Sequence, residues 1–135
     1  MKYFLCALNT VYLGLPSENT ERIVSMSRMQ SSVCATEGND VYISLPLLFK
    51  CADLAAPHGI VLKGKNEERK TTLLTPPLDI DIEIPTEDIY SIPKAFSIIL
   101  RYCRGACFIN KAGEERLIFI LDIDKIIEDC LCVAR

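Results

Sequence analysis

The chain has 135 residues, a size that fits one domain or two small subdomains sharing a core. Half of the residues are apolar and 24% are charged, which excludes a disordered chain. The net charge is −3 and no run of Lys or Arg is longer than two, so the basic stripe of a nucleic-acid-binding surface is missing.

Short apolar runs separated by turn residues predict a β protein. A single helical turn is expected at Ser17–Thr20, and the polar stretch 25–40 is expected to be a loop around one short strand. Pro46 ends the strand before it or confines that strand to a sheet edge. Lys65–Lys70 is predicted as a charged turn, and Phe96–Tyr102 is a further apolar run. In chain order, the predicted strands are Tyr3–Leu8, Val11–Leu15, Val33–Ala35, Val41–Leu45, Ile60–Lys63, Thr71–Leu74, Asp79–Ile84, Ala106–Ile109 and Leu117–Leu121.

The strand at Asp79–Ile84 alternates carboxylates with isoleucines, so one face is expected in the core and the other in water. Leu117–Leu121 is apolar throughout, which predicts a strand buried on both faces. Asp122 or Asp124 is expected to cap a terminal helix whose apolar side is formed by Ile123, Ile126, Ile127 and Leu131. The elements together predict an antiparallel β protein, one small barrel or two, with an end helix.

The seven cysteines are odd in number and match no metal-binding spacing, and most lie in or beside apolar runs. They therefore favour a reducing compartment. The first apolar run is broken at Asn9-Thr10 and no cleavage pattern precedes Pro16, so we do not expect a signal peptide. No stretch reaches 18 apolar residues, so no membrane insertion is expected. We expect a soluble, cytoplasmic protein.

The residues that catalysis or metal binding would need do not cluster in the sequence. The single histidine, His58, lies in a predicted Pro-His-Gly turn, and pairing it with a cysteine nucleophile has no support in the spacing. The acids of Asp79–Ile84 resemble a cation site only superficially, because no second ligand set accompanies them. No glycine-rich phosphate loop is present. We expect no enzyme activity, no metal and no cofactor.

Three segments carry a resemblance to a known family. They are Leu78–Pro93 (LDIDIEIPTEDIYSIP), Arg104–Ala106 (RGA) and Glu115–Ile127 (ERLIFILDIDKII). These segments, together with Tyr3–Val24, resemble CheW, the bacterial chemotaxis adaptor, and the resemblance is weaker between Ser25 and Lys50. The resemblance implies an all-β fold with a C-terminal helix, in which residues 1–135 form a single CheW-like domain of two intertwined SH3-like five-stranded barrels.

The same resemblance implies a non-catalytic adaptor that couples chemoreceptors to the histidine kinase CheA. The implied partners are the regulatory domain of the kinase and the cytoplasmic tip of the receptor. Family members grip the kinase with apolar positions that fall on Phe4, Ser17 and Thr20 here, and only the first of these is apolar. Losing two apolar anchors would cost a few kcal/mol of docking energy.

Two charged positions also differ from the family pattern. The family has a Glu in its opening motif and an Arg in its middle motif, and this chain has Arg22 and Glu37 at those places. A reciprocal exchange would preserve one ion pair with reversed polarity, so we predict charged atoms of Arg22 and Glu37 within about 4 Å of each other.

Two alternatives remain at this stage. One is a divergent CheW-like binding module that does not couple the kinase. The other, from a different functional class, is a small cysteine-dependent enzyme.

Overall fold

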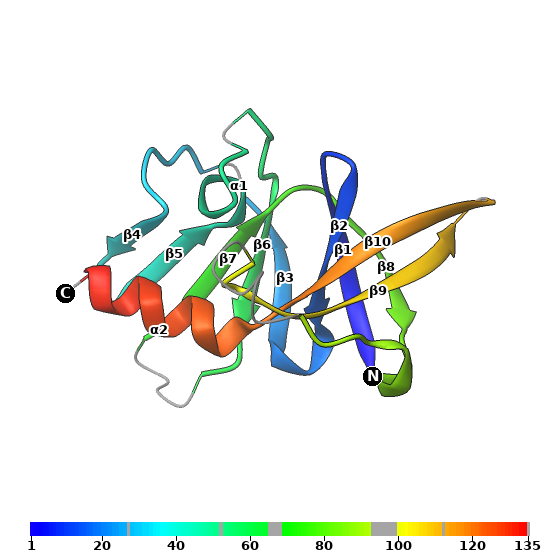
Figure 1. The fold of residues 1–135 in the computed structure, drawn as a ribbon. Helices are drawn as coiled ribbons and strands as arrows, with labels where there is room; N and C mark the ends of the chain where they lie inside the picture. Colours follow the sequence, from blue (N-terminus) through cyan, green and yellow to red (C-terminus); the bar gives the residue numbers. More distant parts are fainter. Residues whose placement is uncertain (27, 52, 65–68, 93–99, 112, 135) are drawn as a thin grey trace.

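The computed structural model describes residues 1–135 except 27, 52, 65–68, 93–99, 112 and 135. Within the described residues, ten strands form two five-stranded sheets, and a helix follows the last strand (Figure 1). The expected fold class, all-β with a C-terminal helix, is confirmed. The apolar run Phe96–Tyr102 and the turn Lys65–Lys70 fall largely outside the described residues.

The first sheet has the strand order β8-β1-β2-β10-β9. Its strands are β1 (Lys2–Leu8), β2 (Val11–Pro16), β8 (Leu78–Glu83), β9 (Cys103–Lys111) and β10 (Glu114–Leu121). The second sheet has the order β3-β6-β7-β5-β4. Its strands are β3 (Thr20–Ser25), β4 (Cys34–Glu37), β5 (Asp40–Ser44), β6 (His58–Leu62) and β7 (Thr71–Thr75). The predicted strand Val33–Ala35 is found a little downstream, as β4, and His58 begins β6 rather than lying in a turn.

The chain leaves the first sheet after β2, builds the whole second sheet and returns to the first at β8. This path explains why the expectation of an antiparallel protein was only partly right. Two chain segments that are distant in sequence run side by side in each sheet, and the pairs β2–β10 and β5–β7 are parallel. Neighbouring strands joined by turns remain antiparallel.

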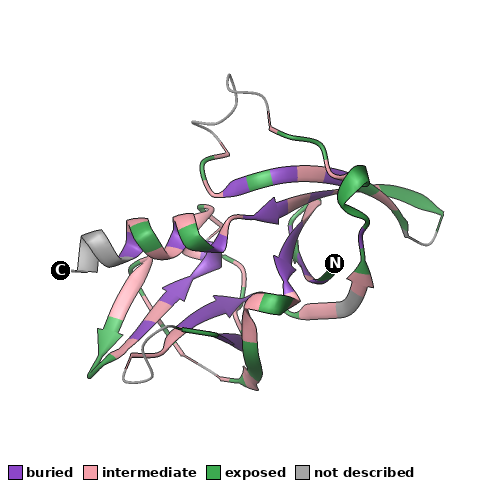
Figure 2. Ribbon diagram, turned by 90° about the horizontal axis from the view of Figure 1, so that it is seen from below, coloured by how far each residue is buried: buried purple, intermediate pink, exposed green. Residues whose placement is uncertain are grey.

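The buried apolar residues form two cores. The first core lies against one face of the first sheet and contains Tyr3, Leu5, Ile84, Cys107, Ile118 and Ile120. The shared core lies between the two sheets and the C-terminal helix, and its members include Cys6, Leu13, Leu15, Ile43, Ile60, Leu73, Leu121 and Ile126. Alternate residues of β1 and β10 thus point into different cores. Buried residues occur along strands of both sheets and on the C-terminal helix (Figure 2).

Burial along two predicted strands differs in detail from the expectation. In β10, Leu117 and Phe119 are only partly buried, so the strand is not covered evenly on both faces. At β8, Ile84 is buried, Ile82 is partly buried and Glu83 is exposed, as the alternation predicts. The side chains of Ile80 and Asp81 lie outside what the structure describes.

The short elements follow local capping rules. Pro46 does not confine β5 to an edge; instead it lies in the first turn of helix α1 (Leu45–Leu48), where its missing N–H is not needed. The Ser44 hydroxyl accepts a hydrogen bond from the Leu47 N–H and caps this helix. The predicted turn at Ser17–Thr20 is a 3-10 helix, η1 (Ser17–Asn19).

The C-terminal helix α2 (Ile123–Ala134) begins where the sequence predicted. The carboxylate of Asp122 accepts a hydrogen bond of 3.1 Å from the Lys125 N–H, which identifies this residue as the cap. Ile123 and Ile126 are buried in the shared core, and α2 packs against β4 of the second sheet. Among the described residues, no helix is both long and apolar enough to cross a membrane.

A strap formed by the segment after a second 3-10 helix, η2 (Thr86–Asp88), covers part of the outer edge of β9. Tyr90 and Ala106 exchange two backbone hydrogen bonds of 2.8 and 2.9 Å. Below the strap, Gly105 provides the space that Ile89 occupies. A Cβ at Gly105 would lie 2.6 Å from Ile89 Cγ2 and 3.1 Å from the Tyr90 carbonyl oxygen.

We therefore expect Gly105→Ala to displace the strap and to lower the free energy of unfolding by about 1–3 kcal/mol, the usual effect of overpacking. Amide hydrogen exchange should speed up at Tyr90 and Ala106, while the amides shared by β2 and β10 act as an internal control. Unchanged protection at Tyr90 would contradict this account of the strap.

Candidate protein-binding surface

The sequence-predicted site residues fall into two groups in the structure. Phe4, Ser17 and Thr20 lie near one another, because β1 contacts η1 and η1 leads directly into β3. Phe4 faces Leu15 across the β1–β2 pair and is half-buried against the shared core. Since Phe4 already packs inside the protein, only part of its ring is available to a partner.

The two polar members of this group differ in their surroundings. Ser17 begins η1 and is half-buried. The Thr20 hydroxyl oxygen is buried and has no hydrogen-bond partner among the described residues. An unpaired buried hydroxyl costs free energy, so Thr20 is held in this position at a cost in stability.

Arg22 lies next to this group on β3, which forms one edge of the second sheet. The side chains of Glu21, Arg22 and Ile23 are all exposed, and Ile23 keeps 41% of its surface in solvent. On the described strands β3 pairs only with β6, so its outer edge presents backbone groups as well as side chains.

Glu37 lies far from this group, at the other edge of the second sheet. It ends β4, at the opposite end of the strand order from β3, and its carboxylate forms a 2.6 Å ion pair with Arg28. No ion pair joins it to Arg22, although the structure describes both residues. The predicted Arg22–Glu37 exchange is therefore wrong. The sequence pattern could not identify Arg28, because the polar stretch 25–40 offered no regular period on which to place it.

Arg28 and Gln30 fix the segment before β4 to the second sheet. The Arg28 guanidinium lies 4.1 Å above the centre of the Tyr42 ring and donates from Nε to the Gln30 side-chain oxygen. The Gln30 amide in turn donates to the carbonyl oxygens of Val33 and Tyr42. These contacts hold the predicted loop as one wall of a groove.

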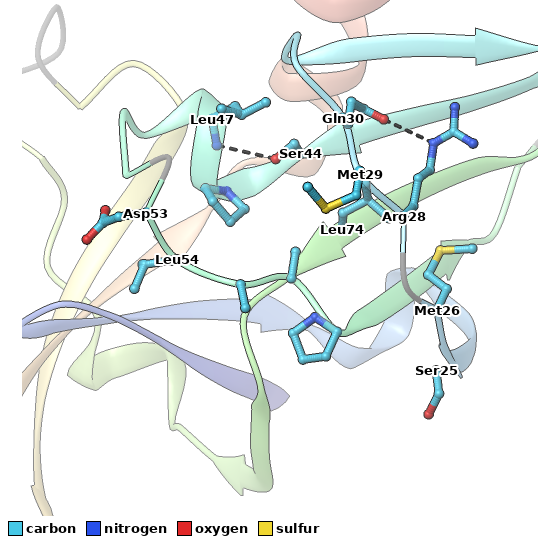
Figure 3. Close-up of a pocket in the computed structure, with 14 residues that line it drawn as sticks. Ser25, Met26, Arg28, Met29, Gln30, Ser44, Leu47, Asp53, Leu54 and Leu74 are labelled. Carbon is cyan, nitrogen blue, oxygen red and sulfur yellow. Dashed lines mark hydrogen bonds between the residues drawn. The ribbon is translucent and has the colours of Figure 1, made fainter.

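The groove lies between this segment, α1 and the stretch 53–57, and its cavity volume is about 720 Å³ (Figure 3). Its lining is mostly apolar, with Met26, Met29 and Leu54 among the contributors, and Arg28 and Asp53 add opposite charges. Met29 is 97% exposed. A groove lined by flexible, apolar methionine side chains is better suited to bind a protein segment than a small polar substrate.

The described residues contain no group of three or more His, Cys, Asp or Glu side chains placed to hold a metal ion. Burial raises the pKa of the thiols of Cys6 and Cys103 to about 12 and that of Cys130 to about 11. Thiols with such pKa values stay protonated near neutral pH and are poor nucleophiles. The cysteine-dependent mechanism therefore receives no support from these three residues.

The scaffolding protein CheW from Thermoanaerobacter tengcongensis has a similar crystal structure. The two share 15% sequence identity, with a TM-score of 0.65 over 90% of this chain and 84% of that one. The chain has a CheW-like fold. A scan against models of protein families gives no match, and a search of curated proteins gives none either. The expectation of a CheW-like fold is confirmed by the structure, while the sequence alone matches no family model.

Proposed function

We propose that the protein is a non-catalytic, cytoplasmic adaptor of a bacterial chemotaxis system. In this role residues 1–135 act as a single CheW-like domain of two interleaved subdomains that binds the regulatory domain of a CheA histidine kinase and the cytoplasmic tip of a chemoreceptor. The observation that supports this best is the match to a scaffolding protein of known fold over nine tenths of the chain.

The surface around η1 and β3 is the proposed docking region, with Phe4, Ser17, Thr20 and Arg22 as contact residues. Its exposed edge is consistent with that role. Glu37 is proposed to contribute at a second place, beside the groove, through its ion pair with Arg28. Two separate contact regions are what a protein that bridges two partners requires.

Charge reversal at Arg22 tests the docking region. Arg22→Glu should weaken binding of the kinase regulatory domain or the receptor tip from the same organism by about tenfold, because Arg22 is exposed on the proposed docking region and a reversed charge there would repel an acidic partner. Isothermal titration calorimetry would measure both affinities. Lys125→Glu is the control, since it makes the same charge reversal on α2, outside both the docking region on β3 and the lining of the groove.

Equal losses in the two variants would point to net charge rather than to a docking region. Failure of the unaltered protein to bind either partner would instead favour a divergent CheW-like module with other partners. This second candidate is supported by the polar residues Ser17 and Thr20, which stand where the family has apolar kinase contacts.

A further inference from the structure

The hairpin formed by β9 and β10 projects beyond the rest of the first sheet. β10 pairs with β2 only at Ile118–Ile120, so its first half, from Glu114 to Leu117, pairs with β9 alone. The far end of this hairpin is a two-stranded ribbon with mostly exposed residues (Figure 2). A ribbon of two strands is marginally stable by itself and gains from a third strand.

The outer edge of β9 has backbone groups that nothing described in the structure occupies. Because the N–H and C=O of Ala106 both bond to Tyr90, they point away from β10. Backbone groups alternate along a strand, so those of Phe108 and Asn110 point the same way. The strap does not reach them, since η2 turns the chain away from the edge immediately before Tyr90. Among the described residues, no backbone hydrogen bond satisfies the outward groups of Phe108 and Asn110.

The side chains beside this edge form an apolar surface. Tyr90 is 67% exposed and Phe108 is 58% exposed. Tyr90 lies opposite Ala106, two residues from Phe108 on the same face of the strand, and Leu117 lies opposite Phe108 on β10. Between Arg104 and Lys111, the stretch Ala106–Asn110 of β9 carries no charged residue and no Pro, the residues that usually protect an edge strand.

Charged side chains at the two ends of the free edge of β9 determine which partner segment can bind there. Glu87 and Asp88 are exposed where the strap turns away, and Glu115 is exposed opposite Asn110. The negative charge of Asp88 also reaches β9, since it adds to burial in raising the pKa of Cys107. These exposed acids favour a segment that carries a basic residue at this end of the edge.

We infer that the free edge of β9 at Phe108 and Asn110 is a docking site for an extended segment of another protein, which adds a strand antiparallel to β9. The segment has an apolar residue opposite Phe108, a polar residue opposite Asn110 and a basic residue at its C-terminal end, beside Glu87 and Asp88. Main-chain hydrogen bonds supply the binding and the side chains supply the selectivity, as in other cases of strand addition. This site is separate from the proposed docking region on β3.

The peptide acetyl-Ser-Thr-Ile-Val-Lys-Ser-amide is a direct probe, with Val opposite Phe108 and Thr opposite Asn110. Titrated into the ¹⁵N-labelled protein, it should shift the amide signals of Phe108 and Asn110 and slow their hydrogen exchange. The same peptide with N-methyl groups on Thr and Val keeps every side chain but cannot donate to β9. Its affinity should be at least about tenfold lower.

Two variants test the protein's side of the contact. Asn110→Pro removes the outward N–H without breaking a bond to β10, and Asn110→Ala keeps that N–H as the matched control. Only the proline variant should lose peptide binding. Asp88→Asn should weaken the Lys peptide several-fold and leave a peptide with Gln in place of Lys unaffected.

Three results would overturn the inference. They are no binding at about 1 mM peptide, equal binding of the N-methylated peptide, and signal shifts confined to residues away from β9. Concentration-dependent dimers that protect the same two amides without peptide would show that the occupant is a second copy instead. The N-methylated peptide keeps the test valid even if Asn110→Pro fails to fold.

Discussion

Ile120→Asp should leave the protein unfolded at room temperature. Ile120 is fully buried in the first core, on a strand that pairs with β2 on one side and β9 on the other. The side chain packs tightly against Gly14: a Cβ built on Gly14 would lie only 3.0 Å from Ile120 Cδ1. This packing leaves no space for a water molecule to solvate a buried carboxylate. Burying an unpaired carboxylate costs several kcal/mol, comparable with the total stability of a small domain.

Ile23→Asp is the matched control for this prediction. It makes the same change on β3, where the side chain is 41% exposed, and it should alter the free energy of unfolding by no more than about 0.5 kcal/mol. Circular dichroism and urea denaturation of both variants provide the comparison. Similar stabilities for the two would contradict the assignment of the first core.

The stability of the protein should fall steeply in alkali, and Cys6 should account for a defined part of that fall. Burial raises the pKa of this thiol from the ordinary value of 9.0 to about 12. Above about pH 9 the unfolded chain loses the proton while the folded chain keeps it. The stabilisation is therefore complete below pH 9 and is lost as the pH rises towards 12, at about 1.4 kcal/mol per pH unit.

Other groups also titrate in this range, so the measurement compares the protein with Cys6→Ala. The variant should be less stable at neutral pH, because it leaves a small cavity in the shared core. Between about pH 9 and 12, its free energy of unfolding should nevertheless decline less steeply than that of the unaltered protein. The difference between the two slopes should be about 1.4 kcal/mol per pH unit. Parallel pH profiles would show that the thiol ionises in the folded protein.

Local patterns in the sequence predicted most strands because each depends on neighbouring residues alone. The alternation at Asp79–Ile84 and the turn residues at Asn9-Thr10 are signals of this kind, and β8 and the β1–β2 turn lie there. The parallel pairs β2–β10 and β5–β7 depend on contacts between distant segments, for which the sequence has no local sign. The resemblance to CheW provided the overall topology that periodicity could not.

The candidate site was harder to predict for the same reason. The positions of Phe4, Ser17 and Thr20 follow from the order of β1, η1 and β3. The ion pair of Glu37 depends on where a loop of irregular sequence lies, and Arg28 takes the place expected for Arg22. The free edge of β9 was not predicted either, because it depends on where the Tyr90 strap ends rather than on β9 itself.

A reconstituted ternary assembly tests the adaptor role most directly. The kinase and membrane-tethered receptor tips from the same organism would be sedimented together with and without this protein, and the kinase in the pellet would be measured. We expect the protein to raise co-sedimented kinase at least about tenfold, and Arg22→Glu to remove most of that gain while Lys125→Glu retains it. Kinase that pellets equally well without the protein, or that never joins the receptor in its presence, would contradict the proposal that this chain couples the two.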